Sequence, residues 1–202
     1  DEQFDFEDAT RVDCLVCHDN SGTYQKHFRA AGIPDESVDL VEVARSVGRP
    51  RRQYCGSCPF LGGGGNAVKH GDMDETLLFP SERIDIHMGK HDMQCVDCHR
   101  TEHHLIRGRS MSVSVDDRNH LECTDCHAQK PHADVRQNAQ TDRLACQTCH
   151  IPHMAADTGT KMTWDWSEAR QDLDITDEHR YLKIKGRFTW ARKVKPEYHW
   201  YN

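Results

Sequence analysis

The ten cysteines of this 202-residue chain all fall into Cys-x-x-Cys pairs, and a histidine directly follows four of the five pairs. The four motifs consist of Cys14, Cys17 and His18; Cys95, Cys98 and His99; Cys123, Cys126 and His127; and Cys146, Cys149 and His150. Thiols three residues apart share one face of a helical turn, where they can form thioethers with the two vinyl groups of one porphyrin. The neighbouring histidine then supplies the proximal ligand of the iron. The repetition predicts four covalently bound haem c groups.

Structural zinc and a disulfide framework are the alternative interpretations of paired cysteines. Zinc sites combine such pairs into tetrahedra of four cysteines, or of three cysteines and one histidine. Neither zinc nor a disulfide requires a histidine directly after the second cysteine, and here that histidine occurs four times. The spacing therefore favours haem over both alternatives.

The histidine content supports the same interpretation. Of the 15 histidines, four belong to the motifs, so eleven remain as candidates for the second axial position of four irons. The six methionines offer histidine–methionine ligation instead, which raises the reduction potential of a haem. The surplus of histidines favours two histidines per iron and low potentials.

The composition leaves little material for an ordinary core. Only 36% of the residues are hydrophobic and the mean hydropathy is -0.84, whereas a globular domain carries roughly 45–50% apolar residues. We expect a multihaem cytochrome c fold over residues 1–202 as a single domain. It should be mostly irregular, with short α-helices, little β-structure and a core built by the haems.

Few segments have a clear periodicity. Leu40, Val41, Ala44 and Val47 recur at helical spacing and predict a short amphipathic helix that ends before Gly48 and Pro50, with its apolar face against a haem edge or another helix. Thr163–Trp166 and the alternating Leu182, Ile184, Phe188 and Trp190 predict a short strand or hairpin that bends at Gly186. Within the C-terminal segment 162–202, the aromatic run Tyr198–Tyr201 is a candidate for packing against another subunit.

Charge and hydropathy exclude some partners and locations. The formal net charge of -7 argues against nucleic acid, which requires clustered basic residues. No run approaches the roughly 18 apolar residues of a membrane span. Because haem is attached to thiols outside the cytoplasm, we expect an exported protein whose signal peptide is cleaved. It would lie outside the cell, on its surface or in the periplasm.

Several segments resemble the octahaem tetrathionate reductase-like cytochromes. They are 47–58, 62–72, 86–88, 145–152, 160–166, 181–186 and 196–198. The resemblance runs over most of residues 14–202 but covers about half of such an enzyme. Sequence context within the family then implies distal ligands at His70, His87, His104 and His132. His120, His27 and His199 are reserves, and any of these histidines can serve a neighbouring subunit.

The chain departs from that family at two points. Where the family has a haem motif, this chain has Cys55, Cys58 and then Pro59, whose ring offers no nitrogen to iron. We expect that haem to be absent and the two thiols to form a disulfide in an oxidising compartment. A thioredoxin-like redox role would need a surrounding βαβ pattern, which the sequence lacks. The second departure is the missing half, with no Cys-x-x-Cys-Lys motif for lysine ligation, so reductase activity is not implied.

A tetrahaem chain of this kind is similar to the secreted cytochromes that polymerise into extracellular conductive filaments. That similarity implies electron transfer without enzymatic activity, in a homo-oligomer or homopolymeric filament that exchanges electrons with redox proteins or extracellular acceptors. A soluble periplasmic electron shuttle and a truncated reductase of sulfur or nitrogen oxyanions are the competing interpretations.

Overall fold

The computed structural model describes residues 8, 12–27, 32–60, 65–68, 71–108 and 120–200. The α-helices are α1 (Leu15–His18), α2 (Leu40–Ser46), α3 (Arg52–Ser57), α4 (Ile86–His91), α5 (Cys95–Cys98), α6 (Val135–Gln140) and α7 (Gln147–His150). Short 3-10 helices are η2 (Glu75–Leu77), η4 (Cys123–Asp125) and η5 (Trp166–Glu168). The strands are β1 (Thr101–Glu102), β2 (Leu105–Ile106), β3 (Thr160–Asp165), β4 (Tyr181–Leu182) and β5 (Gly186–Ala191).

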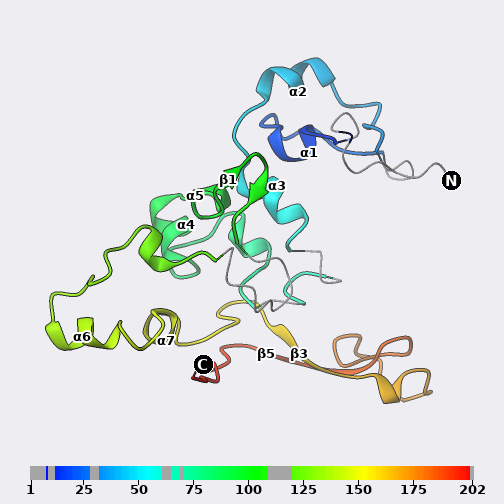
Figure 1. Ribbon diagram of the computed structural model, residues 1–202. Coiled ribbons are helices and arrows are strands. Elements are labelled where there is room, and N and C mark those ends of the chain that lie inside the picture. Colours follow the sequence, from blue (N-terminus) through cyan, green and yellow to red (C-terminus); the bar gives the residue numbers. More distant parts are fainter. Residues whose placement is uncertain are drawn as a thin grey trace.

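The elements follow one another along an open, elongated molecule (Figure 1). Helices α1 and α2 form one end, α3 to α5 lie in the middle, and the paired strands β3 and β5 form an arm at the opposite side from α2. The longest described helix, α2, has seven residues. The predicted fold class, mostly irregular with short helices and little strand, is confirmed. None of the described helices has the length and apolar character needed to span a bilayer.

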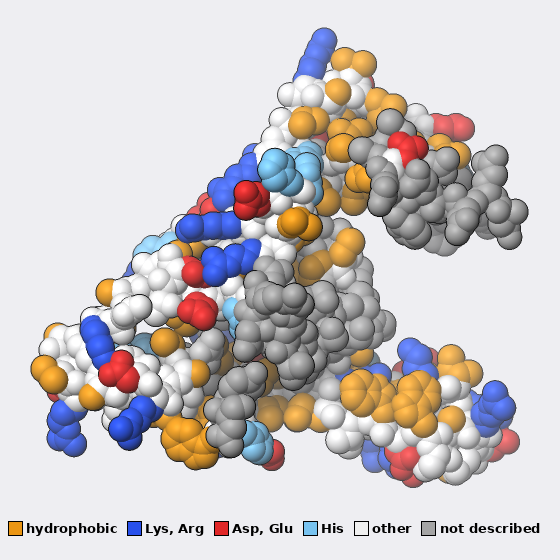
Figure 2. Space-filling view, viewed as in Figure 1, with side chains coloured by type: hydrophobic (Ala, Val, Ile, Leu, Met, Phe, Trp, Pro, Cys, Tyr) orange, Lys and Arg blue, Asp and Glu red, His pale blue; other side chains and the backbone are white. Residues whose placement is uncertain are grey.

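The protein part buries very little apolar surface. Six apolar residues are buried among those described: Val43, Phe60, Ala67, Ala155, Tyr181 and Phe188. Many large apolar side chains remain exposed, including Phe79 at 81% and Leu105 at 79%. Figure 2 shows hydrophobic side chains gathered at the surface of the C-terminal arm. The expectation of a thin polypeptide core is therefore confirmed, and the polypeptide alone leaves much apolar surface in contact with water.

Helix α2 is correctly predicted, and the residue that it buries against the polypeptide lies beside the predicted apolar face. Asp39 caps the helix, because its carboxylate accepts hydrogen bonds from the amides of Val41 and Glu42. The buried residue is Val43, whereas Leu40 and Val41 are 47% and 59% exposed. A helix of two turns has only one or two positions against its neighbour, and the contact with the polypeptide falls one residue from the predicted stripe. The contact with a haem edge stays a prediction.

The C-terminal strands form an antiparallel sheet in the order β3-β5-β4. Thr163 pairs with Thr189 and Trp164 with Phe188, and the register shifts at Met162. Gly186 has a φ of +80°, and a Cβ placed there would stand 1.9 Å from the carbonyl oxygen of Asp165. Only glycine fits such a close approach. The predicted strands and the bend at Gly186 are confirmed.

Candidate haem sites

All four Cys-x-x-Cys-His motifs adopt the same local turn. In each one the histidine amide donates a hydrogen bond to the carbonyl oxygen of the first cysteine, at distances between 2.8 and 3.0 Å. The donors are His18, His99, His127 and His150, and the acceptors are Cys14, Cys95, Cys123 and Cys146. This i to i+4 closure is one turn of helix, which brings the two thiols of a motif to the same side. Each motif is thus pre-arranged to grip one porphyrin.

The second and third motifs share a further stabilising device. Asp97 precedes Cys98, and Asp125 precedes Cys126; each forms a capping box with the first residue of its turn. Each carboxylate also pairs with an arginine: Arg49 lies 2.5 Å from Asp97 and Arg107 lies 3.1 Å from Asp125. Hydrogen bonds from the backbone amides, followed by the arginine contacts, lower the pKa of both carboxyl groups. The two motifs are therefore anchored to segments outside themselves.

Three of the four motif histidines face a second histidine ring. The ring centroids of His18 and His104 lie 6.2 Å apart, those of His87 and His127 lie 6.0 Å apart, and those of His132 and His150 lie 6.0 Å apart. Metal–imidazole bonds are about 2 Å long, and a five-membered ring with bonds of about 1.33 Å adds about 1.1 Å on each side. Two imidazoles on opposite sides of one iron thus have centroids about 6 Å apart. The residues present fit haem ligation.

The other nitrogen of two motif histidines is held by the backbone. Nδ1 of His18 lies 2.8 Å from the carbonyl oxygen of Gly48, and Nδ1 of His99 lies 2.8 Å from that of Arg107. Such an acceptor fixes the proton on Nδ1 and leaves Nε2 as the metal-binding nitrogen. Nδ1 of His132 is buried and has no hydrogen-bond partner in the part of the chain that the structure describes.

Thiols of consecutive cysteine pairs lie close enough to perturb each other. Burial, with the nearby thiol of Cys58, raises the pKa of Cys17, and burial with the thiol of Cys126 raises that of Cys98. Burial and the thiol of Cys146 likewise raise the pKa of Cys123. The cysteine pairs therefore follow one another in space in the order in which they occur in the sequence.

The fifth cysteine pair stands between the first and second haem motifs. The thiols of Cys55 and Cys95 lie next to each other, and their mutual interaction raises the pKa of Cys55 and lowers that of Cys95. Pro59 has no amide hydrogen, so the hydrogen bond that closes the other four turns cannot form here. Cys55 and Cys58 are free thiols in the structure, as are the other eight cysteines. The disulfide between them stays a prediction.

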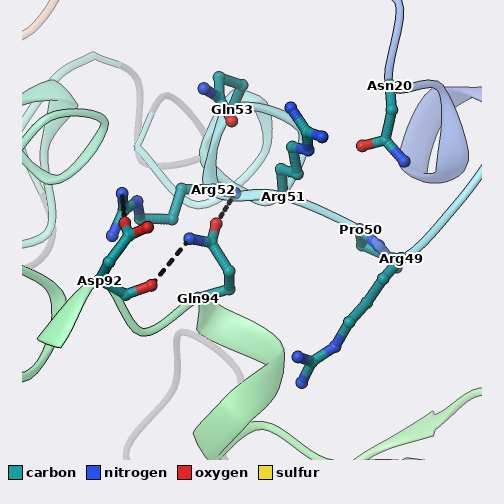
Figure 3. A pocket seen from close by; sticks show the side chains of 8 residues that line it. All are labelled: Asn20, Arg49, Pro50, Arg51, Arg52, Gln53, Asp92 and Gln94. Atoms are coloured by element: carbon teal, nitrogen blue, oxygen red, sulfur yellow. Dashed lines mark hydrogen bonds and ion pairs between the residues drawn. The ribbon is translucent and has the colours of Figure 1, made fainter.

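An arginine-lined cavity lies between the first and second haem motifs (Figure 3). Its volume is about 470 Å³, and its lining consists of Asn20, Arg49, Pro50, Arg51, Arg52, Gln53, Asp92 and Gln94. Arg52 is fully engaged, since it donates to Asp92 and to the carbonyl oxygens of Met88 and Met93. Guanidinium groups pair well with carboxylates, which haem carries as its two propionates. The cavity thus adds positive charge beside the two motifs.

The remaining predicted ligands lie outside the three ring pairs. His70 lies outside the described residues. Among the reserves, His27 and His199 are exposed, and the carbonyl oxygen of His120 accepts a hydrogen bond from Arg107. No group of three or more potential metal ligands occurs within the described ranges, so no tetrahedral zinc site is assembled there.

Sequence reasoning missed a buried carboxylate next to the first motif. Asp19 follows His18 directly and is 0% exposed. Burial alone would raise its pKa, but hydrogen bonds from Ser21, Ser46 and Tyr54 hold the pKa of this carboxyl far below its usual range. A single Asp after a motif carries no periodic signal, and its partners Ser46 and Tyr54 lie 27 and 35 residues away. Only the fold reveals the cluster.

Comparison with known proteins finds similarity to bacterial multihaem cytochromes c. A family model for bacterial cytochrome c matches residues 161–202. The crystal structure of an octahaem cytochrome c from Shewanella oneidensis is similar over 100% of this chain, with 46% sequence identity and a TM-score of 0.82. No curated protein matches significantly. The fold and the motifs are those of a multihaem cytochrome c, which supports haem c as the cofactor and electron transfer as the general function.

The similarity covers only part of the solved relative. This chain spans 46% of the length of the octahaem cytochrome c. The whole-protein properties of that relative therefore do not transfer directly, and the number of haems in this chain follows from its own motifs.

Proposed function

We propose that this chain transfers electrons through four covalently attached haems, each ligated by two histidines. The observation that carries the proposal is the set of three facing ring pairs, with centroids 6.0 to 6.2 Å apart. Each pair combines one motif histidine with one of the histidines expected as distal ligands: His104 with His18, His87 with His127, and His132 with His150. His70, which sequence context implies as a distal ligand, is left for the iron of His99 once the other three are paired.

The pairing cross-links the chain through its cofactors. Each of the three pairs joins a motif to a distal histidine outside that motif. His104 follows the second motif but faces His18 of the first, and His87 precedes the second motif but faces His127 of the third. Every haem would thus bridge two segments that have few apolar contacts of their own. This arrangement explains how a chain with so small a polypeptide core holds a defined structure.

The protein contributes to electron transfer by holding the haems and their axial ligands in fixed positions. Haem supplies a one-electron couple, and two strong axial ligands keep the iron six-coordinate in both redox states. The motif turns fix each cofactor through two thioethers, and the carbonyl oxygens of Gly48 and Arg107 orient the imidazoles of His18 and His99. Two histidines without methionine favour low potentials. These features suit a conduit, in which no iron would need an exchangeable position for a substrate.

Carbon monoxide binding separates a conduit from a truncated reductase. We expect the dithionite-reduced protein to bind almost no carbon monoxide, because every iron already has two protein ligands. A reductase of sulfur or nitrogen oxyanions requires an iron with an exchangeable site. Stoichiometric formation of a carbon monoxide adduct at one haem would favour that alternative over the conduit.

We propose further that the protein acts outside the cell, as a subunit of a homopolymeric filament. Export follows from the chemistry of haem attachment, and electron exchange would then occur with redox proteins or extracellular acceptors. Exposed aromatic side chains of the C-terminal segment support contacts between subunits: Trp164, Trp166 and Trp200 are 47%, 61% and 78% exposed.

A soluble periplasmic shuttle is the alternative. A sharply monomeric species in analytical ultracentrifugation, with no fibres by electron microscopy, would support the shuttle.

A further inference from the structure

Asp19 is a buried carboxylate satisfied entirely by neutral donors. It follows His18 and has 0% of its surface exposed. Its oxygens lie 2.6 to 3.2 Å from six donors: the amides of Ser21, Gly22 and Tyr24 and the hydroxyl groups of Ser21, Tyr54 and Ser46, the last of which also lies 2.8 Å from the carbonyl oxygen of Val43. Six donors saturate both oxygens of an ionised carboxylate. The site is therefore built to hold a negative charge.

Three other carboxylates near the haem motifs have cationic partners, whereas none is seen for Asp19 among the described residues. Asp13 pairs with Lys26, Asp97 with Arg49, and Asp125 with Arg107. Among the described residues, no ion pair joins Asp19 to a lysine, arginine or histidine. A full negative charge thus remains, shielded from direct contact with water, beside the first motif.

We propose that Asp19 is a tuning residue that lowers the reduction potential of the haem attached to Cys14 and Cys17. This inference rests on the proposed function, in which His18 ligates that iron. The oxidised haem carries one more positive charge than the reduced haem, so a nearby fixed anion stabilises the oxidised form. Consecutive Cα atoms are about 3.8 Å apart, so the carboxylate belongs to the immediate surroundings of the ligand.

The size of the effect follows from Coulomb's law. A unit charge about 10 Å away, at an effective dielectric constant of about 20, changes an equilibrium constant roughly tenfold. For a one-electron couple, a tenfold change corresponds to about 59 mV. The first motif lies at one end of the spatial series of cysteine pairs. A lowered potential there would favour electron flow from this haem toward the others.

Potentiometric titration of haem-loaded variants tests the proposal. Asp19→Asn removes the charge and keeps the shape, and should raise the equilibrium constant for reduction of one haem about tenfold, or about 59 mV, with the other couples unchanged. His104→Met identifies that couple, because methionine ligation raises its potential. Asp165→Asn is the control, since this carboxylate also accepts from a serine amide and hydroxyl, those of Ser167, but lies on the C-terminal arm away from the motifs and the expected ligands. It should move no couple.

Two further variants separate charge from packing. Tyr54→Phe removes one hydrogen bond but keeps the carboxylate, so it should leave the potential of the marked couple in place. Asn20→Asp adds a second anion next to Asp19 and should lower the same couple, which keeps the proposal testable if Asp19→Asn does not fold. Unchanged potentials in both Asp19→Asn and Asn20→Asp, or an equal shift in Tyr54→Phe, would overturn the role of Asp19. Failure of the proposed function would look different, as a wild-type protein without low-spin haem.

Discussion

At the scale of single residues, the proposed function depends mainly on the imidazole rings. Each facing pair joins two parts of the chain, so the loss of one distal ring removes a ligand and a cross-link together. His87 is a good test position because it lies on α4, exposed, and faces His127 across 6.0 Å. His91 lies one turn further along the same helix and is also exposed, but no ring contact involving it is seen in the described chain.

Replacement of His87 by alanine should convert one of the four haems to high spin. The iron loses its sixth protein ligand, whereas the three other haems keep theirs. Visible absorption of the oxidised protein in the charge-transfer region measures the change. His91→Ala is the control and should retain the wild-type spectrum. If the two variants have identical spectra, His87 does not ligate iron.

The three ring pairs also differ in mutual orientation. The planes of His132 and His150 are nearly parallel, at 13°, whereas those of His18 and His104 stand at 79° and those of His87 and His127 at 67°. Parallel axial imidazoles split the iron orbitals more strongly than perpendicular ones. We predict a well-resolved rhombic low-spin signal from the haem of His150 in electron paramagnetic resonance, and strongly anisotropic signals from those of His18 and His127. His132→Ala should remove one rhombic signal, and an unchanged rhombic intensity would contradict the assignment.

At the scale of elements, sequence reasoning succeeded where the signal was local. The helix around Leu40 and the strands around Phe188 have periodic apolar residues, and the bend at Gly186 follows from a residue type with unusual conformational freedom. The four motif turns were predictable because their chemistry demands one geometry. The residue that α2 buries against the polypeptide, Val43, was not predictable, because a two-turn helix in a chain with little core has no dominant apolar stripe.

The bend at Gly186 offers a stability test of the C-terminal sheet. Alanine there must adopt a φ of +80° with its Cβ against the carbonyl oxygen of Asp165, so Gly186→Ala should lower the free energy of unfolding by about 1–3 kcal/mol. Gly22 has a similar φ of +79° but open space around its Cα, so Gly22→Ala should cost only about 1 kcal/mol. Urea titration followed by circular dichroism compares them. Equal losses would show that the close approach is unimportant.

At the scale of the whole molecule, the polypeptide and its cofactors form one structure. Six buried apolar residues, spread from Val43 to Phe188, do not make a continuous core, and many large apolar side chains face outward. The ring pairs and the neighbouring cysteine pairs lie through the middle of the elongated chain. The candidate site was largely predictable as a set of residues. Its arrangement was not, because the facing of His104 with His18 depends on contacts between distant segments.

The fifth cysteine pair differs from the four haem motifs because no histidine follows it. It stands between the first and second motifs in space, with the thiol of Cys55 next to that of Cys95. Pro59 removes both the imidazole and the amide hydrogen that the other four turns use. Haem attachment is therefore expected at four cysteine pairs and not at the fifth.

Intact-mass spectrometry of the purified, denatured protein, combined with iron analysis, tests this central claim most directly, because thioether-bound haem survives denaturation. The account predicts the mass of the polypeptide plus four haems, with four irons per chain. A bare polypeptide, zinc in place of iron, or a fifth attached haem would contradict it.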